Sequence, residues 1–306
     1  MPRTKAVLII GGSGFVGSHL AEKLRENYKV FATYRSRRIE IPGVTFIPMG
    51  VDNRNWVKRV VYTAQPDVVI YAAGNSDVDW AEANPREAEL IHTGGAGTVS
   101  GTADIFQPKF IYLSNPYTFD GLKGNYREPD TVLPSTQLGK AKIGGENFIR
   151  GKALNYIILR SSPCFGRSNA RNLSFFDRLR MKLERGEKTE MTVNEIHSFA
   201  AIDGLIEAIQ RLMESGIRNK VVHYGGLTKL SYYDFGREFA KRFGYDPSLI
   251  HPRKTFHKSA VSSPDHVYDF SLNSSFLAES LKIKPLLLEE SFDLVEKLLI
   301  PRARSA

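Results

Sequence analysis

An apolar run that leads straight into a glycine turn and then a helix constrains the fold of this chain more than any other feature. Ala6 to Ile10 contains only apolar residues, Gly11, Gly14 and Gly17 follow, and Phe15 to Glu26 has helical spacing. A strand that is apolar throughout is typical of a parallel sheet covered on both faces. The glycines permit a tight turn, close approach of backbone amides to a pyrophosphate, and close helix packing. The segment therefore predicts a dinucleotide site, to which we also assign Phe15 and Val16.

The rest of the first two-thirds continues as alternating strands and helices. Apolar runs typical of buried strands occur at 30–33, 67–73, 109–114, 156–161 and 220–224, and segments of helical length such as 55–65 lie between them. Strands that alternate with helices imply right-handed crossovers between parallel strands. We therefore predict an α/β fold, with a Rossmann-type doubly wound parallel sheet and a smaller C-terminal substrate lobe.

The later part of the chain differs in character. Residues 169–195 are polar and basic, and two helical patterns follow, one capped by Ser231 and running through Phe243, the other over Ser274 to Leu281. We expect these segments to form a lobe over the carboxyl edge of the sheet. The predicted dinucleotide-binding Rossmann domain comprises residues 1–165 and about 198–225, and the substrate-binding lobe comprises about 166–197 and 226–306.

The end of the second strand predicts which coenzyme binds. An acidic residue there usually binds the ribose hydroxyls of NAD, whereas this chain carries Arg35, Arg37 and Arg38 and no carboxylate between residues 33 and 38. Arginine binds phosphate through two parallel hydrogen bonds and keeps its charge. We expect these side chains to bind the adenosine 2′-phosphate of NADP(H). A solvated basic loop is the alternative.

Charge and composition narrow the choice of ligand. The chain carries 42 Lys and Arg against 33 Asp and Glu, and the resulting net charge of +9 is spread along its length. This balance favours acidic small ligands at least as much as nucleic acid. The single cysteine excludes an internal disulfide framework and a cysteine-based zinc site. The seven histidines lack metal-ligand spacing, so we expect no metal.

Two observations bear on where the protein works. No apolar run approaches the roughly 20 residues needed to span a bilayer. The first residues lead directly into a strand rather than into a cleavable signal. We therefore expect a cytoplasmic protein without a membrane partner.

Several motifs, spread over most of the chain, together resemble one enzyme family. They lie at 66–74, 77–85, 119–134, 139–146 and 160–166. These segments are similar to successive motifs of the extended short-chain dehydrogenase/reductase family, in particular of its dTDP-4-dehydrorhamnose reductase group. The resemblance implies a nucleotide-linked sugar as the substrate class and NADP(H) as coenzyme. The coenzyme-binding residues that we assign with it are Asp52, Ala72, Ala73, Gly74 and Lys142.

Most of the family's catalytic residues are missing at the matching positions. Where the family has Ser-Thr-Asp-Tyr, this chain has the segment from Ser114 to Tyr117, with Asn115 in place of the catalytic hydroxyl. The tyrosine position falls on Leu138, four residues before Lys142, and His92 stands where an asparagine is usual. In such reductases the tyrosine protonates the carbonyl oxygen as hydride leaves the nicotinamide, and leucine has no proton to give. Lys142 can still hold the nicotinamide ribose.

Three hypotheses for function follow. The first is an NADP(H)-binding protein with impaired or absent standard activity, acting as a sensor, regulatory subunit or scaffold. The second is a sugar-nucleotide reductase or epimerase with a substitute acid, for which Tyr117 and Tyr126 are the candidates, while Asn115 could hydrogen-bond the carbonyl. The third is a nucleic-acid-binding protein, which is less favoured because no aromatic platform or known binding module accompanies the basic residues.

The predicted substrate lobe contains a cluster of cations. Arg167, Arg171, Arg178, Arg180 and Lys182 lie within 16 residues, in the segment where relatives bind the diphosphate of the sugar nucleotide. We expect the substrate, a nucleotide-sugar or related acidic ligand, to contact the first three of them and Asp77. A solvated basic face is the alternative. A homodimer and a regulatory partner protein are both left open.

Overall fold

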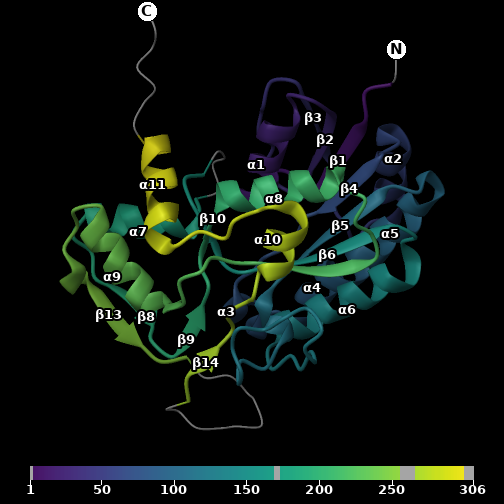
Figure 1. Ribbon diagram of the computed structural model, residues 1–306. Coiled ribbons are helices and arrows are strands. Elements are labelled where there is room, and N and C mark those ends of the chain that lie inside the picture. Colours follow the sequence, from purple (N-terminus) through teal and green to yellow (C-terminus); the bar gives the residue numbers. More distant parts are fainter. Residues whose placement is uncertain (1–2, 169–172, 256–265, 300–306) are drawn as a thin grey trace, which may run out of the picture.

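The central feature of the molecule is a sheet of seven parallel strands, seen in a computed structural model that describes residues 3–168, 173–255 and 266–299 (Figure 1). The strands are β1 (Ala6–Ile10), β2 (Lys29–Tyr34), β3 (Val44–Pro48), β4 (Val68–Tyr71), β5 (Lys109–Ser114), β6 (Tyr156–Ser161) and β11 (Lys220–Tyr224). They lie in the order β11-β6-β5-β4-β1-β2-β3, and each neighbouring pair is parallel. The predicted Rossmann-type α/β fold is confirmed.

Helices cover both faces of this sheet, which explains why the central strands β1 and β4 are apolar at every position. In β1, Val7 and Ile9 pack into one core, whereas Leu8 and Ile10 pack into another, because successive side chains of a strand point to opposite faces. The first core includes α1 (Phe15–Leu24), α8 (Ile202–Glu214) and α10 (Ser275–Leu281). The second includes α2 (Arg54–Ala64), α5 (Ala96–Ala103) and α6 (Gln137–Lys152).

One strand of the sheet was not expected from the sequence. β3 lies at the sheet edge, pairs only with β2 among the sheet strands, and is half-exposed along its length. An edge strand needs neither a continuous apolar run nor a full set of backbone donors, so it can end in Pro48. The pattern used to find the buried strands therefore does not apply to it.

A smaller lobe with an aromatic core stands beside the carboxyl edge of the sheet (Figure 1). Its helices are α7 (Phe175–Glu184), α9 (Tyr232–Arg242) and α11 (Leu288–Leu299), and β8 (Thr189–Thr192) pairs with β13 (Ile250–Arg253). Phenylalanines from distant segments, Phe165, Phe176, Phe235, Phe239 and Phe292, are fully buried together. Ser231 caps α9 as expected, by accepting a hydrogen bond from the Asp234 amide. The exact division into two domains stays a prediction.

The other elements are short. They are α3 (Val78–Ala83), α4 (Pro85–Glu89), a π-helix (Leu90–Gly95), three 3₁₀ turns (Asp104–Phe106, Pro116–Thr118 and Pro247–Leu249), and strands β7 (Cys164–Phe165), β9 (Glu195–His197), β10 (Ala200–Ala201), β12 (Leu230–Ser231) and β14 (Tyr268–Asp269). β12 and β14 flank β9, and β7 pairs with β10. Across the described ranges, no helix combines the length and apolar character needed to cross a membrane.

A buried ion pair fixes helix α6 against the sheet. The carboxylate of Glu146, which is fully buried, accepts hydrogen bonds from Nε and Nη2 of Arg160 at 2.9 and 2.7 Å and from the Ser114 hydroxyl at 2.7 Å. Arg160 is 1% exposed and lies on β6, and Ser114 ends β5. Because a buried charge is costly unless it is paired and hydrogen-bonded, α6 cannot slide or rotate without a large loss of stability.

This ion pair leads to a test of stability. Replacing Arg160 by alanine should lower the free energy of unfolding by about 3–5 kcal/mol, because the Glu146 charge would stay buried without its main partner. Arg150 offers a matched control, since it contacts the same carboxylate at 3.4 Å but is 38% exposed. Arg150→Ala should cost at most about 1 kcal/mol in the same urea titration. Equal losses for the two variants would contradict the role given to the buried pair.

Candidate functional site

A continuous cleft follows the carboxyl ends of the sheet strands. It consists of three adjoining cavities, which we name the outer, central and lobe cavities, of about 800, 390 and 600 Å³. The outer and central cavities share Gly14 and the segment 72–75 after β4. The central and lobe cavities share Tyr117 and Tyr232. Ligands of open parallel sheets bind at this edge, where the strand order reverses.

The turn after β1 forms the floor of the outer and central cavities. Gly11 has a φ of +83°, which favours glycine, and a Cβ there would lie 2.7 Å from the Cα of Ala73. The first amides of α1, like those of any α-helix, lack an intrahelical acceptor, and its N-cap Gly14 has no side chain to cap them. A Cβ on Gly17 would collide with the Gly11 carbonyl. This geometry fits a pyrophosphate at the helix N-terminus.

The other residues assigned to the coenzyme can be placed relative to this turn. Gly11 lines the outer cavity, Gly14 lines both cavities, and Phe15 and Val16 line the central one, while Gly17 is buried beneath the turn. Ala72, Ala73 and Gly74 line both cavities, and Asp52 lines the outer one. Gly74 has a φ of +117°, and a Cβ there would collide with the His92 ring.

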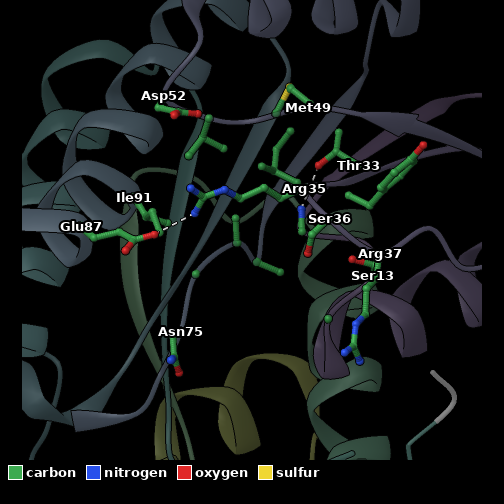
Figure 2. A pocket seen from close by; sticks show the side chains of 18 of the residues that line it. Ser13, Thr33, Arg35, Ser36, Arg37, Met49, Asp52, Asn75, Glu87 and Ile91 are labelled. Atoms are coloured by element: carbon green, nitrogen blue, oxygen red, sulfur yellow. Dashed lines mark hydrogen bonds and ion pairs between the residues drawn. The ribbon is translucent and has the colours of Figure 1, made fainter. Parts of the chain in front are cut away.

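The three arginines after β2 differ in position. Arg35 and Arg37 line the outer cavity, whereas Arg38 is not among its lining residues and lies 3.8 Å from Glu40. Figure 2 shows Arg35 reaching across the cavity, where its Nη1 donates to Oε1 of Glu87 at 2.8 Å. The side chain of Arg37 points away from this pair. The hydrogen bond to Glu87 raises the pKa of Arg35. Glu87 belongs to α4 and was not foreseen from the sequence.

Lys142 and Asn115 face the central cavity together. Lys142 is 7% exposed, and its Nζ donates to the Leu113 carbonyl at 2.8 Å. Burial lowers the pKa of Lys142 to about 7, with Glu146 partly opposing the shift. The Asn115 Oδ1 accepts from the Tyr117 amide, and its Nδ2 is buried with no hydrogen-bond partner in the described part of the chain. A ligand carbonyl could therefore accept a hydrogen bond from Asn115.

His92 closes the central cavity from the π-helix. Its Nε2 lies 3.0 Å from the Asn75 carbonyl, while no partner is found for Nδ1 within the described ranges. Burial, together with the nearby Lys142 charge, holds the pKa of His92 well below its usual value. The imidazole is therefore neutral and supplies no proton at physiological pH.

Leu138 lies one helical turn before Lys142 but does not line any of the three cavities. It is fully buried and packs in an apolar cluster with Ala141, Tyr117 and Phe270. Residues four apart on a helix share a face, so a tyrosine at this position would lie beside Lys142. The leucine instead presents only hydrocarbon.

Tyr117, one of the two substitute acids considered, lines both the central and the lobe cavities. Its hydroxyl lies 3.4 Å from Nε2 of His197. Burial raises the pKa of Tyr117 well above its usual value, and Glu195 and Tyr232 raise it further. A general acid works best with a pKa near the working pH, so these surroundings oppose proton donation.

Tyr126, the other candidate acid, lies away from the cleft. Its ring stacks on Phe119 with a centroid separation of 4.0 Å, and its hydroxyl donates to Asp120 at 2.5 Å. Burial raises the pKa of Tyr126, and the Asp120 carboxylate adds to the shift. Tyr126 lines none of the three cavities.

Two of the four residues proposed to bind the substrate line the cleft. Asp77 lines the lobe cavity and caps α3 by accepting from the Trp80 amide at 2.8 Å. Arg178 lines all three cavities, and its Nη1 donates to the Leu173 carbonyl at 2.6 Å. Arg167 is exposed and outside these linings, and Arg171 lies outside the described residues.

Some residues that line the cleft were not foreseen from the sequence. Tyr232 and Glu195 line the lobe cavity, and Glu87 and Trp80 line the outer one. The cap at Ser231 indicated a helix but not that its first residue, Tyr232, would face the cavity. Glu87 meets Arg35 across 52 positions of sequence, and no local pattern signals such a contact.

Comparison with known proteins identifies a family that matches most of the chain. The family model described as RmlD substrate binding domain matches residues 5–266. A dTDP-4-dehydrorhamnose reductase of Aggregatibacter actinomycetemcomitans is 26% identical over 232 residues, which cover 75% of this chain and 76% of that protein. Methionine adenosyltransferase 2 subunit beta of Bos taurus is 23% identical over 257 residues, which cover 81% and 75%.

Solved structures show the same fold. The crystal structure of dTDP-4-dehydrorhamnose reductase from Bacillus anthracis in complex with NADP superimposes with a TM-score of 0.80. The match covers 97% of this chain and 100% of that one, at 20% sequence identity. At this identity the likeness concerns the fold alone, including the smaller C-terminal sheets beside the seven-stranded one.

The lowered pKa of Lys142 predicts how stability changes with pH. In the unfolded chain the Lys142 amine is half-deprotonated at its ordinary pKa of 10.5, whereas burial in the folded protein lowers that pKa to about 7. Between these values the unfolded state binds more protons, so stability rises with pH. Relative to Lys142→Met, the coenzyme-free protein should gain about 2 kcal/mol between pH 7 and 9, measured by urea unfolding. A difference that does not change with pH would contradict the shift.

Proposed function

The chain belongs to the RmlD substrate binding domain family of extended short-chain dehydrogenases/reductases, and from this premise we propose that it is an NADP(H)-binding protein whose standard reductase activity is impaired or absent. The observation that carries the proposal is the pairing of a well-formed dinucleotide turn with a buried leucine at position 138. The family resemblance supplies the nucleotide-sugar as ligand class.

Several contacts support coenzyme binding. The first turn of α1 offers backbone amides at the cleft, and the small residues at 72–74 leave room above the sheet edge. Arg35 and Arg37 line the outer cavity and suit a 2′-phosphate. Lys142 reaches the central cavity, where it would donate to the ribose next to the nicotinamide. When bound, the coenzyme supplies a hydride.

The loss of turnover follows from the missing acid. As hydride reaches a carbonyl carbon, the oxygen gains negative charge and needs a proton. Leu138 has none to give, His92 is held neutral, and Tyr117 holds its proton more tightly than a free tyrosine does. General acid catalysis is typically worth about 10²–10⁴-fold, so the remaining rate is expected to be low.

A second candidate function is a reductase or epimerase that uses Tyr117 as the substitute acid. This alternative is favoured by one observation, since Tyr117 lines the same cavity as Lys142 and Asn115. Its raised pKa argues against it. The first function is therefore preferred.

The biological role that fits a coenzyme-binding protein without turnover is that of a sensor, scaffold or regulatory subunit. One relative carries the name of a subunit of a different enzyme, methionine adenosyltransferase 2. A nucleotide-sugar or related acidic ligand in the lobe cavity would meet Asp77 and Arg178. The cytoplasmic location and a homodimer or partner protein stay predictions.

Coenzyme binding can be tested through the arginines after β2. Replacing Arg35 by alanine should weaken NADPH binding about tenfold or more, because a hydrogen-bonded charge pair with the 2′-phosphate is lost, and should leave NADH binding nearly unchanged. Arg38→Ala is the control, since Arg38 lies outside the cavity lining. Coenzyme fluorescence measures both affinities. Tighter binding of NADH than of NADPH by the unaltered protein would refute the assignment.

Restoring a hydroxyl at position 138 tests the missing acid. Leu138→Tyr should raise the rate of NADPH oxidation with dTDP-4-dehydrorhamnose by about 10²-fold or more, since general acid catalysis contributes that much. Leu138→Phe has nearly the same size without the hydroxyl and should stay inactive. Retained NADPH binding by both variants shows that the cleft is intact. Rapid turnover by the unaltered protein would count against the proposal.

A further inference from the structure

The guanidinium of Arg35, on which the coenzyme preference depends, is held by a carboxylate from a distant segment. Arg35 lies just past β2, and its Nη1 donates to Oε1 of Glu87 on α4 at 2.8 Å (Figure 2). Both residues line the outer cavity. We propose that Glu87 sets the coenzyme preference by competing with the 2′-phosphate of NADP(H) for Arg35. This inference rests on the proposed function and adds a residue that determines its specificity.

Glu87 is held in place by the fold. The π-helix that follows α4 is tied to the sheet by two buried hydrogen bonds, from the Tyr71 hydroxyl to the Ile91 carbonyl at 2.6 Å and from the Tyr112 hydroxyl to the His92 carbonyl at 2.8 Å. Ala88, next to Glu87, is fully buried. The backbone that carries Glu87 is therefore fixed opposite the end of β2, where the phosphate would arrive.

The charges at this end of the outer cavity nearly cancel. Arg35 and Arg37 come from the β2 turn, whereas Asp52 and Glu87 contribute carboxylates. The third arginine of the lining, Arg178, comes from the lobe. A phosphate that binds Arg35 either displaces Glu87 or binds the guanidinium beside it, and in both cases it lies close to the negative charge of Glu87. NADH has no 2′-phosphate and can bind with the Arg35–Glu87 pair intact.

The expected change in NADPH affinity is modest because both side chains of the Arg35–Glu87 pair are exposed to solvent. The side chains of Arg35 and Glu87 are 63% and 43% exposed, so solvent screens their attraction and a phosphate can displace the carboxylate. Removing the competing charge should therefore tighten NADPH binding about three- to tenfold. The preference for NADP(H) is smaller in this chain than the three arginines after β2 suggest.

The test compares Glu87→Gln with a control on the same helix. Glu89→Gln removes one negative charge two residues away, at an exposed position that does not line the outer cavity. Affinities for NADPH, NADH and the competitor 2′,5′-ADP are measured by coenzyme fluorescence at constant ionic strength. Glu87→Gln should tighten NADPH and 2′,5′-ADP about three- to tenfold and change NADH less than about twofold. Glu89→Gln should leave all three nearly unchanged.

A double variant shows whether the effect acts through Arg35. In an Arg35→Ala background, Glu87→Gln should no longer tighten NADPH binding, because the guanidinium for which Glu87 and the 2′-phosphate compete is absent. An unchanged NADPH affinity in Glu87→Gln, or an equal gain for NADH, overturns the inference while the proposed function stands. Failure of the unaltered protein and of Glu87→Gln to bind either coenzyme overturns both.

Discussion

The register of helix α6 against the sheet is the constraint from which the rest of the cleft follows. Glu146 is fully buried and bound to Arg160 of β6 and Ser114 of β5, so the helix cannot turn or slide. Because residues four apart share a helical face, Lys142 is carried to the central cavity and Leu138 to the apolar layer next to it. The same buried contact that stabilises the fold therefore presents Lys142 to the central cavity and keeps the side chain at position 138 out of it.

The electrostatics of the central cavity are consistent with a site that binds a reduced coenzyme without transferring its hydride. Burial leaves Lys142 half-charged near neutral pH and His92 uncharged, and it makes Tyr117 a weaker acid than it would be in water. Burial is the largest cause of each shift. In the proposed function, coenzyme binding uses the backbone amides of the glycine turn and the arginines of the outer cavity, and those groups take no part in proton transfer.

Local patterns in the sequence predicted the buried strands and the glycine turn, because both depend mainly on residues that are close together in the chain. Continuous apolar runs located the buried strands, with the bounds of β1, β5, β6 and β11 as expected, and the glycine spacing located the turn. The edge strand β3 was missed because a half-exposed strand carries no such run. Long-range contacts were also missed, since nothing near Arg35 indicates that Glu87 will meet it, and nothing near Tyr117 indicates that it will be buried beside Glu195 and Tyr232.

The central claim is that the cleft binds the reduced coenzyme but passes its hydride to a carbonyl slowly or not at all, because position 138, where the family has its proton-donating tyrosine, carries a leucine. A single-turnover experiment tests it most directly, with the protein in excess over NADPH and dTDP-4-dehydrorhamnose added in a stopped-flow cell. We expect coenzyme fluorescence to report binding while the near-ultraviolet absorbance of the reduced nicotinamide stays constant over many seconds. Rapid, stoichiometric loss of that absorbance would contradict the claim.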